Sequence, residues 1–263
     1  LKQSPRCWNE KFNFHLEKLG FQRSQHDYCL YTKFSKDSTM FLLLYVDDLL
    51  ITGNKESEIE SLKKQLSKIF EMSDCGELKH YLGIKIEYDR EKGFMKLSQE
   101  ANITKILHKF GMTDCNEARS PMEKGLQLIN NENEPTKNSY RELLGSLMYI
   151  MLCVRPDICY AIGYMGRFQQ NPGEIHWTTL RRILRYIKGT KDLKLIFNRN
   201  SEERAIIGYA DADWASSLHD RKSTSGYVFF IFGCPILWSS KKQATVATSS
   251  SEAEYVAVSH ARS

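Results

Sequence analysis

The sequence predicts an α+β fold in three successive parts, because the spacing of its apolar residues changes twice along the chain. In residues 1–97, short apolar or alternating runs are interleaved with amphipathic stretches, which is typical of strands and helices sharing one core. In residues 98–200 the apolar residues recur mainly at the helical period, and in residues 201–263 three strand-like runs precede a last helix. We therefore expect part boundaries near residues 97 and 200.

The first part begins with a helix whose limits are marked by Pro5 and Gly20, residue types suited to the start and the end of a helix. Two apolar runs then flank Asp47-Asp48, which predicts a hairpin joined at these aspartates. Further elements are predicted as strands over 28–34, 40–45 and 49–52, an amphipathic helix over 55–70, and strands over 80–88 and 93–97.

The second part is predicted to be mostly helical, and the third to be three strands followed by a helix. A polar segment over 130–138 reads as a loop between helices. The predicted elements are helices over 99–110, 139–153, 157–169 and 174–188, strands over 206–210, 226–232 and 235–239, and a helix beginning near Ser251.

Composition narrows the classes of function without choosing one. A hydrophobic content of 41% over 263 residues is enough to bury more than one core, and the formal charge of +5 is compatible with a polyanionic partner without requiring one. The seven cysteines contain no CxxC pair, so they indicate free thiols rather than a zinc site. With no apolar run long enough to span a bilayer, we expect a soluble, intracellular protein with no membrane partner. The first residue is Leu1 rather than Met, which suggests that the start of a longer reading frame is missing.

Adjacent aspartates at the tip of an apolar hairpin carry like charges that repel each other. A divalent cation between them and a phosphate would relieve this repulsion, because hard cations prefer carboxylate oxygens. The structural alternative is a solvent-exposed turn, for which aspartate is also well suited.

The string Tyr45-Val46-Asp47-Asp48, between two apolar runs, resembles the YVDD motif of the reverse transcriptase palm in copia-type LTR retrotransposons. The resemblance implies a palm in residues 1–97, a thumb and connection in residues 98–200, and a truncated βββα unit of ribonuclease H type in residues 201–263. It also implies that Asp47 and Asp48 are catalytic residues that bind Mg²⁺ in two-metal phosphoryl transfer.

Three further strings resemble segments of the same family. Residues 1–8 resemble its LKQxPRxW segment, which makes Gln3 a nucleotide-binding residue. Tyr81, Leu82 and Gly83 match the primer-grip hairpin, and Arg181 and Arg185 fall in the thumb and connection region, so all five are expected to contact nucleic acid. A solvated basic helix face is an equal alternative for the two arginines.

The string Tyr209-Ala210-Asp211-Ala212 resembles the opening strand of the family's ribonuclease H domain, and residues 249–257 resemble its first helix. The resemblance makes Asp211 and Glu254 catalytic residues that bind Mg²⁺. Glu252 is the alternative to Glu254, because residues two apart on a helix do not share a face. Either glutamate could instead serve only as a first-turn residue that stabilises the helix start.

The family's activity is RNA-directed DNA synthesis with ribonuclease H cleavage, and the implied partners are an RNA template, a DNA primer, an RNA–DNA hybrid and dNTPs. Cytoplasmic virus-like particles with a nuclear phase are the implied location. Each carboxylate set lacks a member in this chain, so we expect the chain alone to bind nucleic acid weakly and to be inactive. The alternative function is a non-catalytic or co-opted nucleic-acid-binding protein.

Overall fold

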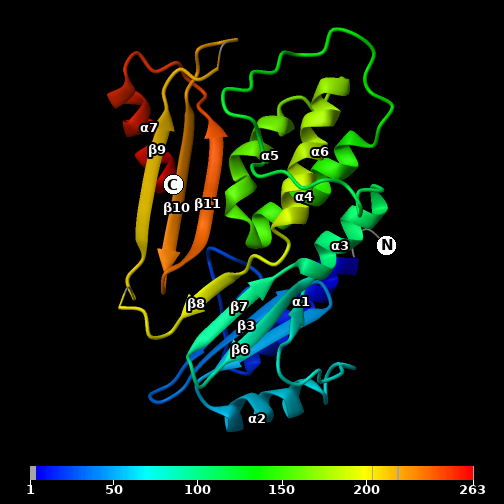
Figure 1. The fold of residues 1–263 in the computed structure, drawn as a ribbon. Coiled ribbons are helices and arrows are strands. Elements are labelled where there is room, and N and C mark those ends of the chain that lie inside the picture. Colours follow the sequence, from blue (N-terminus) through cyan, green and yellow to red (C-terminus); the bar gives the residue numbers. More distant parts are fainter. Residues whose placement is uncertain (1–3, 203, 218, 263) are drawn as a thin grey trace. The chain divides into compact units, whose positions relative to one another are not determined.

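The computed structural model describes residues 4–202, 204–217 and 219–262. The chain divides into two compact units, Leu1–Glu77 and Leu78–Ser263 (Figure 1). The predicted mixture of helices with antiparallel strands is confirmed, while the three-part division at residues 97 and 200 stays a prediction. No described helix combines the length and the apolar character needed to cross a lipid bilayer.

The first unit is an antiparallel sheet with helices on one of its faces. Its elements are α1 (Ser4–Lys18), β1 (Gln22–Arg23), β2 (Leu30–Phe34), β3 (Thr39–Tyr45), β4 (Asp48–Gly53) and α2 (Glu56–Leu66), and the strand order is β1-β2-β3-β4. Alternate residues of β3, such as Leu42 and Leu44, are buried against Leu16 of α1 and Leu66 of α2. The residues between them, such as Tyr45, are exposed, so the other face of this sheet is open to solvent.

The second unit begins with a sheet that is completed by a distant strand. Its strands are β5 (His80–Tyr81), β6 (Ile84–Asp89), β7 (Phe94–Ser98) and β8 (Leu195–Asn198), in the order β5-β6-β7-β8. The short strand β8 was not predicted from the sequence. It follows the helical part in the chain and pairs with β7, with Leu97 opposite Leu195.

The helices between these strands share one apolar core. They are α3 (Glu100–Lys109), α4 (Tyr140–Val154), the 3₁₀ turn η1 (Pro156–Ile158), α5 (Cys159–Gly166) and α6 (Glu174–Gly189). The core contains Ile103, Leu147, Ile162 and Leu184, which are all fully or almost fully buried. The helix predicted over 157–169 is observed as the shorter helix α5. It begins later because the segment from Pro156 to Ile158 forms the 3₁₀ turn, and it ends at Gly166.

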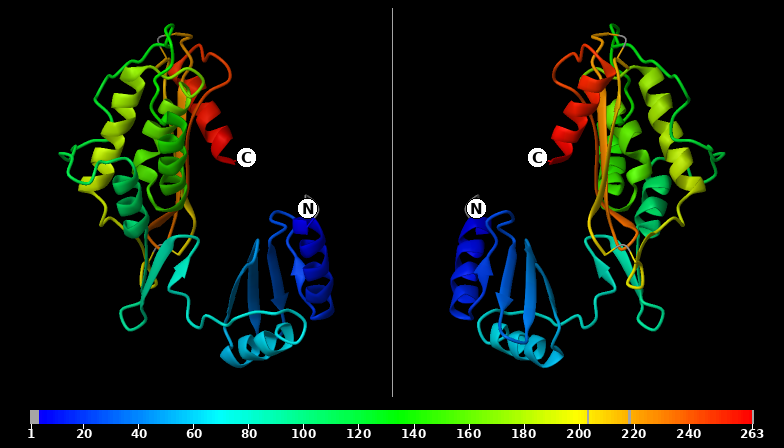
Figure 2. Two further views of the ribbon diagram at one scale, coloured as in Figure 1. Left: turned by 90° about the vertical axis from the view of Figure 1, so that its right-hand side faces the viewer. Right: turned by 90° about the vertical axis from the view of Figure 1, so that its left-hand side faces the viewer.

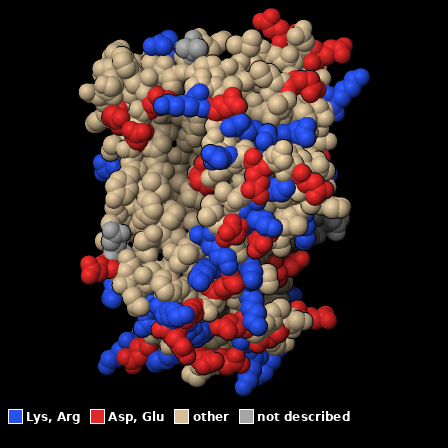
Figure 3. All heavy atoms as spheres, in the orientation of Figure 1, with Lys and Arg blue, Asp and Glu red and all other residues tan. Residues whose placement is uncertain are grey.

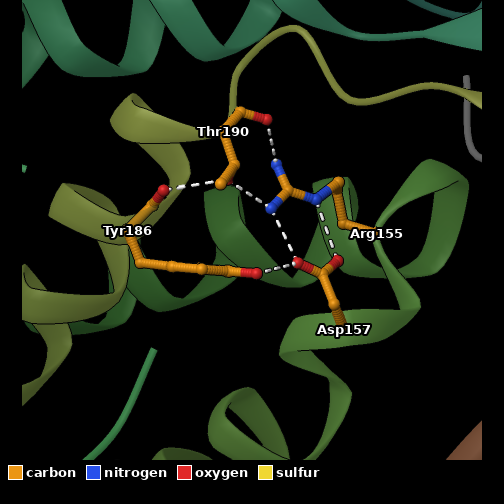
Figure 4. A network of polar contacts seen from close by, with 4 residues as sticks. All are labelled: Arg155, Asp157, Tyr186 and Thr190. Atoms are coloured by element: carbon orange, nitrogen blue, oxygen red, sulfur yellow. Dashed lines mark hydrogen bonds and ion pairs between the residues drawn. The ribbon is translucent and has the colours of Figure 1, made fainter. Parts of the chain in front are cut away.

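A buried arginine joins the start of that turn to the end of α6 (Figure 4). Arg155 is only 2% exposed and binds both carboxylate oxygens of Asp157, at 2.9 and 2.7 Å. It also donates to the carbonyl and hydroxyl oxygens of Thr190, at 3.0 and 2.6 Å, while Tyr186 donates to Asp157 at 2.8 Å. The guanidinium charge is therefore fully paired, as a buried charge must be if it is not to destabilise the fold.

The last part of the second unit is a three-stranded antiparallel sheet with different layers on its two faces. It consists of β9 (Ile207–Asp213), β10 (Thr224–Ile231), β11 (Cys234–Lys242) and α7 (Ser250–Arg262), with strand order β11-β10-β9. Figure 2 shows α7 on one side of this sheet and the helices α4 to α6 on the other. Trp238 of β11 donates to the carbonyl oxygen of Met151 in α4 at 3.1 Å, which ties the sheet to the helical core.

Candidate functional site

The hairpin of β3 and β4 is present as predicted, but its turn is displaced by one residue. Tyr45 pairs with Asp48, so the two turn residues are Val46 and Asp47, and Asp48 is the first residue of β4. The prediction that Asp47 and Asp48 together form the turn was wrong. Val46 has a φ of 54°, because two-residue hairpin loops need positive φ to match the twist of the strands. For a β-branched residue this conformation is strained, at a cost of about 1–3 kcal/mol.

Both aspartates of the hairpin are exposed and unpaired. Neither the carboxylate of Asp47 nor that of Asp48 has a hydrogen bond or ion pair within the described residues. Since residues opposite each other in an antiparallel pair lie on the same face, Asp48 shares with Tyr45 the face that α1 and α2 leave open. Two neighbouring carboxylates with free oxygens can bind a hard divalent cation together with phosphate oxygens. That role stays a prediction.

The turn before these carboxylates is bound by a side chain from α1. The indole nitrogen of Trp8 donates to the carbonyl oxygen of Val46 at 2.9 Å. The Trp8 ring packs against Phe12 and Phe70, with ring centroids 5.6 and 5.2 Å apart. Sequence reasoning matched Trp8 to a family string without assigning it a role, because nothing in the string shows which backbone atom an indole will reach.

In the hairpin predicted to contact the primer, an aromatic side chain of a helix also binds a carbonyl group of the turn. Tyr81 is the last residue of β5, and Leu82 and Gly83 form the turn, with φ values of 49° and 75°. Positive φ at both turn residues is the pattern of a type I′ hairpin, which glycine accepts and leucine resists. The hydroxyl of Tyr149 in α4 donates to the carbonyl oxygen of Leu82.

The basic residues of α6 have mainly intramolecular partners. Arg185 donates to the carbonyl oxygen of Asn116 at 2.6 Å and Lys188 to that of Cys115 at 2.6 Å, while Arg182 pairs with Glu123 at 2.9 Å. These contacts hold the segment after α3 against α6. Only Arg181 is exposed without a partner among the described residues, so it is the better of the two predicted arginines for a phosphate contact.

Figure 3 shows no large patch of a single charge on the face it presents. Blue and red side chains alternate, and the surface over β9 and β10 is largely uncharged, with Ile206 and Tyr209 more than 60% exposed. Long-range attraction of a polyanion would therefore be modest on this face, and local contacts would have to provide most of the affinity.

Asp211 lies on β9, one residue before Ala212. Ala212 pairs with Ser225, whose hydroxyl accepts from Gln243, and Gln243 also donates to the carbonyl oxygen of Ala253 in α7. The Ala212 face is thus the one that α7 covers, and Asp211 points to the opposite face because side chains alternate along a strand.

Asp211 thus points away from the face that α7, the helix of Glu254, covers. An ion bound by both carboxylates would therefore have to lie at the outer edge of β9. The opposite face is also the one on which Arg167 of the helical part reaches Thr224, at 3.4 Å. In the part of the sheet that the structure describes, β9 is an edge strand, so side chains from both faces can meet there.

The two candidate glutamates of α7 differ clearly in their contacts. One oxygen of Glu252 accepts from the backbone N–H and the hydroxyl of Thr248, both at 2.7 Å, and these bonds lower the pKa of Glu252. This is a helix-capping role. Glu254 is half-buried, and its carboxylate has no hydrogen bond or ion pair among the described residues. The geometry thus favours Glu254 over Glu252 as the residue with free oxygens.

Two predicted features remain to be described, namely the nucleotide-binding residue and the metal ligands. Gln3, the predicted nucleotide-binding residue, lies outside the described residues. Within the described ranges, no three histidine, cysteine or acidic side chains are grouped so that they could hold a metal ion by themselves. The fit of Mg²⁺ to this chain therefore depends on pairs of carboxylates, completed by oxygens of bound phosphates or of other ligands.

Comparison with known proteins agrees with the motifs. Residues 1–124 match the reverse transcriptase (RNA-dependent DNA polymerase) family. A transposon Ty5-1 protein of Saccharomyces cerevisiae is 32% identical over 98% of this chain and 84% of its own length. The chain belongs to the reverse transcriptase family of transposon Pol polyproteins. Retrovirus-related Pol polyproteins from transposon TNT 1-94 of Nicotiana tabacum and transposon RE1 of Arabidopsis thaliana are 40% and 37% identical over 98% and 100% of this chain.

The chain spans about a fifth of the length of the TNT 1-94 and RE1 polyproteins, 20% and 18%. No solved structure gave a significant match. The segment that matches the family includes α1 and the two turns, at Val46 and Leu82, whose carbonyl oxygens accept a hydrogen bond from an aromatic side chain. The elements β9 and α7 lie beyond this segment. The predicted membership of the Pol polyproteins is thus confirmed, and the ribonuclease H assignment stays a prediction.

The different contacts of the α7 glutamates lead to a first prediction. Glu252→Ala removes the acceptor for Thr248, so amide hydrogen exchange at Thr248 and in the first turn of α7 should become faster. Glu254→Ala removes no such contact and is the matched control, which should leave these rates unchanged. Hydrogen exchange followed by mass spectrometry measures both variants, and equal rates in the two would contradict the capping role of Glu252.

Proposed function

We propose that this chain supplies the metal-binding hairpin of a retrotransposon RNA-directed DNA polymerase, and part of an associated ribonuclease H, within a Pol polyprotein. The observation that carries the proposal is the pair Asp47 and Asp48, exposed and unpaired at a hairpin inside the segment that matches the reverse transcriptase family. The partners would be an RNA template, a DNA primer, an RNA–DNA hybrid and dNTPs.

In this function Asp47 and Asp48 would hold Mg²⁺ against the phosphates of the incoming nucleotide. Bound there, the ions would activate the primer 3′-hydroxyl and neutralise the charge of the leaving pyrophosphate. The chain's own contribution is to keep two carboxylates at one end of an open sheet face, with no lysine or arginine among the described residues competing for them.

For the ribonuclease H part, we propose that Asp211 and Glu254 bind Mg²⁺ at the edge of β9. The capping contacts of Glu252 support this choice, since they leave Glu254 as the glutamate with free oxygens. Tyr81, Leu82 and Gly83 would contact the primer, and Arg181 a phosphate of the nucleic acid. Arg185 has its Nε already bound to Asn116, so its part in this contact would be smaller.

Direct measurement of metal binding tests the polymerase proposal. Mn²⁺, a paramagnetic substitute for Mg²⁺, should bind the wild-type chain at the hairpin and broaden the NMR signals of residues 45–49. Asp47→Asn should weaken this binding by about tenfold or more, because a charged ligand is lost. Glu71→Gln, an exposed acidic residue of the same unit, is the matched control and should bind as the wild type does. Broadening that persists unchanged in Asp47→Asn would contradict the proposal.

A further inference from the structure

The backbone that directs Asp47 and Asp48 is in a conformation that valine rarely adopts. Val46 has a φ of 54°, and its side chain is 65% exposed, so packing around that side chain does not hold the conformation. Residues in such regions persist only when their surroundings over-determine them. The pairing of β3 with β4 imposes this conformation, and a further contact from outside the hairpin would stabilise the turn in it.

Trp8 provides that contact. Its indole N–H binds the carbonyl oxygen of Val46 at 2.9 Å, from a position 38 residues earlier in the chain. The ring is fixed by Phe12 and Phe70, which belong to the buried core of the first unit. The donor is therefore already ordered, and little side-chain entropy is lost when the hydrogen bond forms.

We propose that Trp8 is a positioning residue for the carboxylates of Asp47 and Asp48. By binding the carbonyl group of Val46, it holds the peptide between Val46 and Asp47 in one orientation, and this sets the direction in which both carboxylates leave the turn. The inference rests on the proposed function insofar as these carboxylates bind a divalent ion. Trp8 itself touches neither the ion nor the substrate.

The same arrangement occurs at an independent place in the chain. Leu82, with a φ of 49°, is a second apolar turn residue whose carbonyl oxygen accepts from an aromatic side chain of a helix, in this case Tyr149 of α4. Both turns belong to strings that match the reverse transcriptase family. An aromatic donor bound to a strained turn is therefore a repeated solution in this chain.

A double-mutant cycle tests the proposal. Trp8→Phe removes the donor but keeps an aromatic ring in the core, and Val46→Gly removes the cost of positive φ, because glycine adopts this region freely. The 263-residue chain is made as wild type, as each single variant and as the double variant. Two quantities are measured, namely amide exchange at Asp47 and Asp48 and the affinity for Mn²⁺. Phe14→Leu, which changes an aromatic residue of the same helix that is 53% exposed, is the matched control.

Trp8→Phe should accelerate exchange at the turn and weaken Mn²⁺ binding by about fivefold, the factor expected for one net hydrogen bond. In the Val46→Gly background the same substitution should have a clearly smaller effect, because the turn no longer needs the donor to hold a strained residue. Unchanged exchange and affinity in Trp8→Phe, an equal effect in both backgrounds, or an equal effect of Phe14→Leu would each overturn the inference. If the wild type binds no Mn²⁺ at the hairpin, the proposed function fails, while the exchange measurements still decide the role of Trp8.

Discussion

Replacing Asp48 by asparagine in a Pol polyprotein that contains this chain should lower Mg²⁺-dependent nucleotide incorporation by about a thousandfold or more. Asparagine has nearly the same shape, so the hairpin should still form, but the loss of one negative charge removes a ligand that acts together with Asp47 and the substrate phosphates. Groups that act as a unit lose far more than a proportionate share of the rate when one is removed. Single-nucleotide primer extension on an RNA template measures the effect.

Two comparisons separate a loss of chemistry from a loss of binding in that experiment. Affinity for the primer-template should stay within about twofold in Asp48→Asn, since the phosphate contacts that dominate affinity come from other residues. Glu71→Gln should incorporate nucleotides at the wild-type rate. Asp48→Asn with more than about a tenth of the wild-type rate would contradict the assignment of Asp48 as a metal ligand.

Replacing Arg155 by alanine should lower the free energy of unfolding of the second unit by about 3–5 kcal/mol. The change removes four hydrogen bonds and leaves Asp157 with a partly buried, unpaired charge, and breaking a buried ion pair in this way is strongly destabilising. Urea unfolding followed by circular dichroism measures the effect. Arg181→Ala, on the exposed side of α6, is the matched control and should change the free energy by less than about 0.5 kcal/mol.

The effect of Arg155→Ala should also depend on pH. Burial would raise the pKa of Asp157, but the hydrogen bonds and charge of Arg155, with the hydrogen bond from Tyr186, lower it more strongly, and the net result is a lowered pKa. A carboxyl whose pKa is lowered by folding contributes stability above its unfolded pKa of about 4, and loses that contribution as the pH falls through the folded pKa. The difference between wild type and variant should therefore be largest near neutral pH and shrink below about pH 4. A difference that grows on acidification would contradict the ion pair.

Much of the fold follows from local patterns in the sequence. The helices α3 and α6 were predicted to within about a residue of their observed limits, because apolar positions such as Ile103 and Ile183 recur at the helical period. The strand β8 was not predicted. Its four residues carry no strong pattern, and it is stabilised by pairing with β7, a contact between segments that lie far apart in the chain.

The candidate site shows the same division between local and distant information. The string around Asp47 and Asp48 marks a hairpin, but the exact turn depends on strand register, which placed Val46 rather than Asp48 in the turn. The glutamates of α7 have the same residue type and similar positions in the sequence. The contacts with Thr248 distinguish Glu252 from Glu254, and these contacts depend on the path of the chain before the helix.

The position of β8 also has a consequence for how the protein forms during synthesis. When β7 leaves the ribosome, its outer edge has no partner until the whole helical part has been made, because β8 follows α6. In that interval β5, β6 and β7 form a three-stranded sheet in which the edge of β7 is open, and other chains can pair with an edge of this kind. Residues Leu1–Glu77 contain all the strands of their own sheet and have no such delay. Nascent chains that end before Leu195 should therefore aggregate through β7. A fragment expressed with its end near residue 97 or residue 194 lacks β8, so the edge of its β7 would stay open.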